Sequence, residues 1–118
     1  MIVIFLSGIS PYNEIYYNLS MELNKIPEKY QDDIKKATSL LKSEGCKAVF
    51  LFGSMVTGKI HQNSDIDIGI KGLPPKKFFR VNAYLDKELS NKIDLVDFDL
   101  RNDFYALLDS LGEVVELG

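Results

Sequence analysis

The stretch SDIDIGI at positions 64–70 constrains the fold of this 118-residue chain more than any other. Its isoleucines alternate strictly with Asp65, Asp67 and Gly69, which is the period-two pattern of a β-strand with two different faces. The isoleucines therefore face a core, and both aspartates point away from it. Such a strand needs further strands beside it and helices packed over its apolar face.

Helices and strands alternate along the rest of the sequence. Because only about five residues join some of these elements, part of the sheet must be antiparallel. We therefore predict an α/β (α+β) fold, a single mixed sheet with helices on one face. The patterns predict helices at 28–44, 75–90 and 102–111, and strands at 47–52, 64–70, 92–98 and 114–117.

The first 20 residues differ from the remainder because they carry almost no charge. Their opening run of six apolar residues is too short to span a bilayer. No Lys or Arg precedes Lys25, so the basic start of a secretory signal is missing. We expect residues 1–20 to form an ordered appendage, with a strand at 2–6 and a helical turn at 14–20, and residues 21–118 to form the domain.

Composition narrows the class of protein. A hydrophobic fraction of 46% suffices for a core, and the net charge of −3 argues against strong nucleic-acid binding through bulk positive potential. Cys46 is the one cysteine, so no internal disulfide forms. These features predict a cytoplasmic protein that does not associate with membranes, with Cys46 as a small core residue.

The segment GSMVTGKI at 53–60 resembles a phosphate loop but departs from it at Ile60, where a metal-binding hydroxyl is required. A strand pattern, and not a long helix, follows shortly after it. We therefore reject a phosphate-loop ATPase. Gly53 and Ser54 instead predict a tight turn whose backbone amides point together and bind the phosphates of a nucleotide.

Asp65 and Asp67 repel one another by about 3 kcal/mol if they lie ~5 Å apart at an effective dielectric constant of about 20. In a cleft, such a pair binds a hard divalent cation, Mg²⁺ or Mn²⁺. The alternative is a strand at the sheet edge with a hydrated outer face.

A third carboxylate comes from the later stretch KIDLVDFDL. Ile93 and Leu95 predict a core-facing side, so Asp94 faces the other way and joins the first two aspartates if the strands are neighbours. Three carboxylates can hold two metal ions roughly 3.5–4 Å apart. Asp97 and Asp99 are expected at the strand end, in solvent or as helix caps.

Together these residues resemble the nucleotidyltransferase superfamily of the DNA polymerase beta type, and most closely its minimal members (MNT proteins), over roughly residues 28–117. The resemblance is carried by Gly53-Ser54, Gly58, Ser64-Asp65-x-Asp67 and Ile93-Asp94-Leu95.

The resemblance implies that Asp65 and Asp67 bind two Mg²⁺ or Mn²⁺ ions and that Asp94 completes the catalytic metal site. It implies transfer of AMP from ATP to a hydroxyl. Many minimal members carry an arginine where this chain has Thr57, and Lys59 is the nearest replacement for its charge. The predicted nucleotide- and phosphate-binding residues are Gly53, Ser54, Thr57, Gly58, Lys59 and Ser64.

The resemblance also implies a partner, a small helical HEPN-type toxin whose tyrosine receives the AMP, which makes this chain an antitoxin. Phe78, Phe79 and Tyr84 are candidates for a docking face, and a homodimer is left open. Two other functions remain. One is a catalytically silent module that binds a nucleotide or a partner, which Thr57 favours; the other is an interaction protein whose acidic face is merely hydrated.

Overall fold

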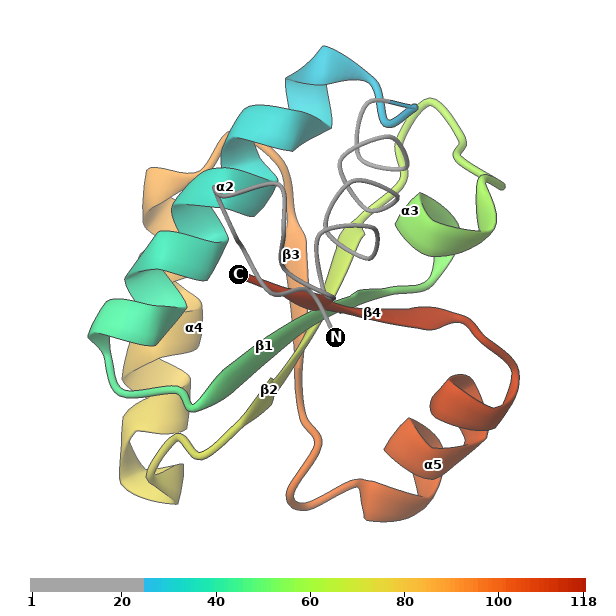
Figure 1. The fold of residues 1–118 in the computed structure, drawn as a ribbon. Helices are drawn as coiled ribbons and strands as arrows, with labels where there is room; N and C mark the ends of the chain where they lie inside the picture. Colours follow the sequence, from blue (N-terminus) through green and yellow to red (C-terminus); the bar gives the residue numbers. More distant parts are fainter. Residues whose placement is uncertain (1–24) are drawn as a thin grey trace, which may run out of the picture.

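The computed structural model describes residues 25–118. The strand and helical turn predicted within residues 1–20, and the boundary between residues 20 and 21, lie outside this range. The described elements follow one another in the order α2 (Glu28–Ser43), β1 (Ala48–Phe52), α3 (Ser54–Thr57), β2 (Ile66–Lys71), the 3-10 turn η1 (Pro75–Lys77), α4 (Phe78–Glu88), β3 (Ile93–Asp97), α5 (Asn102–Ser110) and β4 (Val114–Leu117) (Figure 1).

The four described strands form a single sheet in the order β3-β2-β1-β4. The neighbours β1 and β2 are antiparallel, as are β1 and β4, whereas β2 and β3 are parallel. The predicted mixed sheet is therefore confirmed. The parallel pair follows from the crossover through η1 and α4, which returns the chain to the end of the sheet at which β2 began (Figure 1).

The main core lies between the sheet and the helices α2 and α4 (Figure 1). The three isoleucines of β2 are fully buried there, as their alternation predicts. Helix α2 ends at Ser43, and Gly45 follows two residues later with a φ of 109°, which suits glycine. The amides of Gly45 and Cys46 donate to the carbonyl oxygens of Lys42 and Leu41 respectively, both at 3.1 Å, which closes the helix. Cys46 is buried, as predicted.

Helix α5 packs on the opposite face of the sheet, so the prediction that helices cover one face only is wrong. Helices α2 and α4 cover the predicted face. Here Phe50, Phe52, Phe98 and Leu108 form a second, mainly aromatic cluster. A β-carbon at position 69 would collide with the ring of Phe98, so glycine at this point of β2 makes room for that ring.

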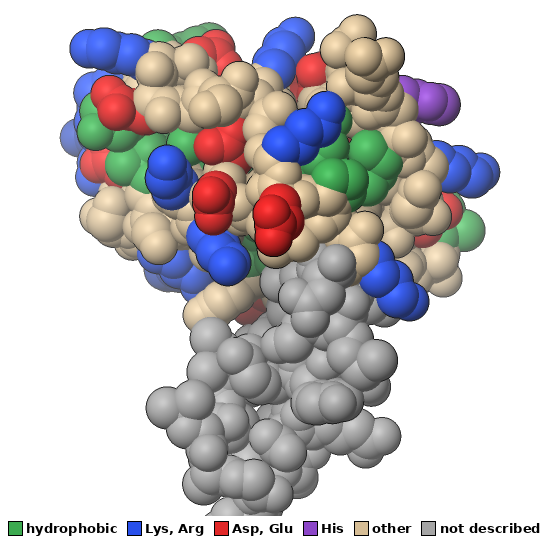
Figure 2. Space-filling model, turned by 90° about the horizontal axis from the view of Figure 1, so that it is seen from above, with side chains coloured by type: hydrophobic (Ala, Val, Ile, Leu, Met, Phe, Trp, Pro, Cys, Tyr) green, Lys and Arg blue, Asp and Glu red, His purple; other side chains and the backbone are tan. Residues whose placement is uncertain are grey.

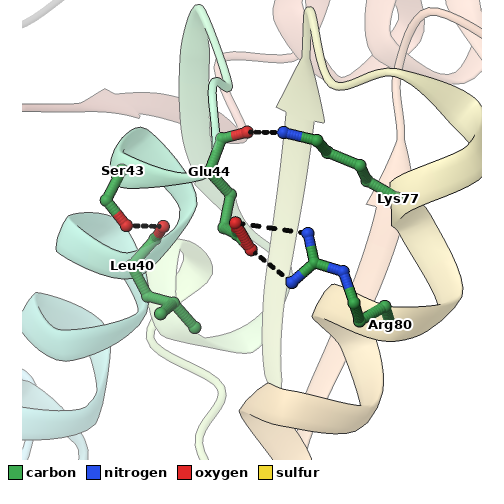
Figure 3. Close-up of polar contacts among 5 residues, drawn as sticks. All are labelled: Leu40, Ser43, Glu44, Lys77 and Arg80. Carbon is green, nitrogen blue, oxygen red and sulfur yellow. Dashed lines mark hydrogen bonds and ion pairs between the residues drawn. The ribbon is translucent and has the colours of Figure 1, made fainter.

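Polar contacts join the end of α2 to the start of α4 (Figure 3). Both terminal nitrogens of Arg80 donate to the carboxylate of Glu44, at 2.9 and 3.3 Å, and Lys77 donates to the Glu44 carbonyl oxygen at 3.2 Å. These contacts fix the orientation of α4 over the sheet.

Asp97 lies at the end of its strand, as predicted, but its predicted exposure to solvent is wrong. Its side chain is 8% exposed, and its Oδ1 accepts a hydrogen bond from the Asp99 amide at 2.9 Å. The strand remains paired with β2 up to Asp97, opposite Ile70, and this pairing turns the carboxylate toward the core face. Asp99 is exposed, as expected, and accepts a hydrogen bond from the Gly72 amide at 2.7 Å.

Candidate functional site

The three predicted carboxylates meet at the end of the sheet where β2 and β3 begin. Asp67 of β2 lies directly beside Asp94 of β3 in the parallel register. Asp65 precedes the first residue of β2 and is two positions before Asp67. Acidic side chains adjoin one another near the middle of this end of the molecule, with basic side chains beside them (Figure 2). The strands β2 and β3 are therefore neighbours in the sheet, as the sequence analysis required for the three carboxylates to come together.

The surroundings of Asp67, the middle carboxylate, raise its pKa. The pKa of Asp67 is raised from 3.8 to about 6, chiefly by burial, then by the negative charges of Asp94 and Asp65, with a smaller effect of hydrogen bonding to Asp94. The burial of Asp67 comes from the aromatic side of the sheet, because Asp67 of β2 lies opposite Phe52 of β1. A half-buried carboxylate between two others is poised to bind a cation or a proton.

The other two carboxylates are more accessible. Asp94 is exposed, and Asp65, whose side chain is 44% exposed, lies 4.0 Å from the ammonium group of Lys92. Among residues 25–118, no three acidic, histidine or cysteine side chains converge on one point as they do around a bound metal ion. The register of β2 and β3 therefore brings Asp67 and Asp94 side by side without such a three-residue cluster among the described residues.

Gly53 brings the turn after β1 against the carboxylates. Its φ is 72°, which suits glycine, and a β-carbon at this position would collide with Oδ2 of Asp67. Position 53 therefore needs glycine for its backbone conformation and for its contact with Asp67. No signal in the sequence alone indicated that this contact exists.

The short helix α3 begins directly after this glycine. The amides of Val56 and Thr57 donate to the Gly53 carbonyl oxygen, both at 3.0 Å. Within residues 25–118 the preceding amides, those of Ser54 and Met55, have no hydrogen-bond acceptor, as is usual for the first turn of a helix. These amides lie next to the residue that touches Asp67.

The remaining predicted phosphate-binding residues lie further away along the loop. Thr57, Gly58 and Lys59 are exposed at the far end of α3. The Ser64 hydroxyl accepts a hydrogen bond from the His61 amide at 2.7 Å and so shapes the loop before Asp65. In the described part of the chain, no ion pair or hydrogen bond joins these residues to the carboxylates.

Two residues near the site were not predicted. Lys92 pairs with Asp65, and Arg101 lines a groove that begins at Asp94. The signal for Lys92 was its position immediately before an aspartate-bearing strand. Arg101 lies seven positions after Asp94 on the β3–α5 connection, and only the path of that connection places it there.

A mixed sheet with aspartates aligned beside a glycine-serine turn defines a domain of the nucleotidyltransferase type. A family model described as polymerase beta, nucleotidyltransferase, matches residues 35–110, and the chain belongs to this family. The predicted family and the class of enzyme are thereby confirmed. No curated protein matches the chain.

Solved structures show similarity over part of the chain. A toxin–antitoxin crystal structure with AMP-PNP is 32% identical, with a TM-score of 0.46, and the match covers 58% of this chain and 56% of that one. A mutant of the toxin–antitoxin MntA-HpeT is 27% identical, with a TM-score of 0.53, over 71% of this chain and 70% of that one. The chain thus spans little more than half the length of the first of these relatives. No helix among the described residues is long and apolar enough to cross a membrane.

Proposed function

We propose that this chain transfers a nucleoside monophosphate, AMP from ATP, to a hydroxyl group and releases pyrophosphate. The observation that carries the proposal is the contact of Gly53 with Asp67. It sets backbone amides suited to phosphate beside aligned carboxylates suited to metal ions. A nucleoside triphosphate needs both, because its charge must be neutralised while its α-phosphorus is held for attack.

Asp65, Asp67 and Asp94 are the proposed ligands of Mg²⁺ or Mn²⁺, with two ions expected. Carboxylate oxygens are the donors that these ions prefer. The raised pKa of Asp67 supports this role, because a bound cation offsets both the burial and the repulsion that raise it. When bound, the ions neutralise the phosphates and lower the pKa of the acceptor hydroxyl.

Side chains and backbone amides of the protein bind the phosphates and accept the proton. The Ser54 side chain and the amides that follow Gly53 hold the phosphates, Lys59 adds positive charge from its exposed loop, and Asp94 accepts the proton of the attacking hydroxyl. The acceptor oxygen bonds to the α-phosphorus as the bond to the bridging oxygen breaks, and pyrophosphate leaves. Thr57, Gly58 and Ser64 shape the loop around the triphosphate.

The proposed acceptor is a tyrosine of a small helical HEPN-type toxin, so that the chain acts as an antitoxin. The similarity to a mutant of the toxin–antitoxin MntA-HpeT, with its TM-score of 0.53, supports this proposal.

The second candidate is a catalytically silent module that binds a nucleotide or a partner. Thr57 favours it, because this exposed position lacks the arginine that many minimal nucleotidyltransferases carry. Lys59 is a point charge and does not reproduce the two parallel hydrogen bonds of an arginine.

Transfer of label from ATP labelled at its α-phosphate tests the proposal, with Mg²⁺ or Mn²⁺ and a candidate HEPN-type protein. Asp65→Asn is expected to lower transfer on the order of 100-fold or more. The matched control is Asp86→Asn, an exposed aspartate of α4 outside the three proposed ligands. Thr57→Arg is expected to increase transfer. If wild type and Asp65→Asn label the acceptor equally, the proposed site is wrong; if only Thr57→Arg is active, the silent module is correct.

A further inference from the structure

A groove of about 540 Å³ follows the outer edge of β3 and begins at Asp94. β3 is the edge strand of the described sheet, so its outer backbone groups have no partner strand within that sheet. Leu95 and Val96 form part of the floor, and residues from the start of α4 and from the β3–α5 connection form the walls. The groove is thus continuous with the proposed proton acceptor.

Two large apolar side chains stand at the walls of this groove in contact with solvent. Phe79 of α4 is 82% exposed, and Leu100 is 74% exposed. Arg101 lines the groove as well, and among residues 25–118 it forms no ion pair. Exposed apolar residues that line a groove together with a cation are typical of a binding surface.

We propose that this β3 groove seats an extended polypeptide segment of the acceptor protein. The segment places a large apolar side chain between Phe79 and Leu100 and a carboxylate against Arg101. The proposal rests on the proposed function, because it describes how an acceptor hydroxyl reaches Asp94.

The arrangement of the site requires the acceptor to arrive from this side. Gly53 and α3 approach Asp67 from β1, which is on the side of β2 opposite to β3. Phosphates held by α3 therefore occupy the β1 side of the carboxylates. The attacking and leaving oxygens of an in-line displacement lie on opposite sides of the phosphorus. The hydroxyl consequently enters along β3, where Asp94 is exposed.

The chemistry of the groove favours a polypeptide. An open strand edge pairs with an extended chain through backbone hydrogen bonds, while side pockets select its side chains. A nucleic acid fits poorly, because Asp94 and the net charge of −3 repel a polyanion.

Peptide binding tests the groove without nucleotide or metal. The probes are short fluorescein-labelled peptides that contain one tyrosine. Each has Leu or Ser at the position meant for Phe79 and Leu100, and Glu or Lys at the position meant for Arg101, and is named by these two residues. Fluorescence anisotropy of the full-length chain in EDTA gives the affinity. Phe79→Ser and Leu100→Ser are expected to weaken binding of the Leu/Glu peptide at least about tenfold. Their matched controls, Leu107→Ser and Leu111→Ser, change exposed side chains outside the groove and are expected to leave binding unchanged.

A charge exchange tests the ionic contact. Arg101→Glu is expected to reject the Leu/Glu peptide and to bind the Leu/Lys peptide, a reversal that general misfolding cannot produce. Thermal unfolding of each variant checks that the fold is intact. In the presence of ATP and Mg²⁺, the groove variants are expected to raise the KM for the peptide and to leave kcat unchanged.

Several results would overturn the groove proposal. The proposal is wrong if no peptide binds at millimolar concentration, or if wild type and Phe79→Ser bind the Leu/Glu peptide equally well. It is also wrong if a single-stranded oligonucleotide displaces the bound peptide. A benzophenone-bearing amino acid at position 100 identifies other occupants: a cross-link to the peptide supports the proposal, and one to residues 1–24 or to a second copy of the chain refutes it. Peptide binding in the groove without any nucleotide transfer refutes the proposed function alone.

Discussion

Asp67→Asn removes the most crowded carboxylate of the site, and we expect it to raise the free energy of unfolding at neutral pH in the absence of metal. The folded protein holds the pKa of Asp67 at about 6 instead of 3.8. That difference corresponds to about 3 kcal/mol at pH values above both pKa values. Because the side chain is only half-buried and water screens its neighbours, we expect a gain of about 1–2 kcal/mol.

The gain has a definite pH dependence. Between pH 3.8 and about 6 the folded state holds the Asp67 proton more tightly than the unfolded chain does. Stability from this group is therefore complete below pH 3.8 and is lost as the pH rises through about 6. The difference between variant and wild type should be small at pH 4, should grow up to about pH 6, and should remain constant at pH 7–8.

Urea unfolding in EDTA at pH values from 4 to 8 measures this difference, with Asp86→Asn as the matched control on an exposed part of α4. Mg²⁺ at ten times its dissociation constant should then stabilise the wild type by about 1.4 kcal/mol and leave Asp67→Asn unaffected. If Asp67→Asn is less stable than wild type at pH 8, or if their difference does not depend on pH, the crowding of Asp67 is refuted.

Three further predictions concern residues that shape the site or the fold. Gly53→Ala should destabilise the protein by about 2–3 kcal/mol and abolish transfer, because the new β-carbon adds a collision to the backbone strain. Gly58→Ala should cost about 1 kcal/mol, because Gly58 also has a positive φ but has open space around it. Thermal unfolding measures both changes. Asp33→Ala should cost about 2–3 kcal/mol in urea unfolding, because the buried carboxylate accepts hydrogen bonds from the amide and side chain of Asn91 at 2.7 and 2.9 Å. Glu44→Ala should cost at most about 1 kcal/mol, and less in high salt, because its arginine partner in Figure 3 is exposed. A loss above 2 kcal/mol for this last variant, or equal effects of the two glycine substitutions, would contradict the respective reasoning.

The sequence was informative where one face of an element is apolar. Alternation in β2 predicted correctly that its isoleucines are buried and that Asp67 points away from them. The same rule applied to β3 placed Asp94 on the same side, and the parallel register then set Asp94 beside Asp67. Because period-two patterning determines the face on which a side chain lies, the pattern alone suffices to group the aspartates of two neighbouring strands.

Features that depend on contacts distant in sequence were not predictable in this way. Asp97 is the last residue of β3, and its charge suggested solvent, but it lies opposite Ile70 and is buried there. The packing of α5 on the second face depends on Gly69, which leaves space for Phe98. A local pattern does not report which distant ring fills the space beside a glycine. The groove at β3 likewise depends on where the chain turns after that strand.

The second face of the sheet joins stability to the proposed chemistry. On this face, Gly69 of β2 leaves space for Phe98, which packs with Phe52 into a buried aromatic cluster. Two positions earlier on the same strand, Asp67 lies beside Phe52 in the register of β1 and β2. The cluster that holds α5 thus supplies the low-polarity boundary that partly desolvates the carboxylate and raises its pKa. A free energy cost at Asp67 is the expected consequence of placing a carboxylate at the margin of an apolar cluster, and binding of a cation at the proposed site would offset that cost.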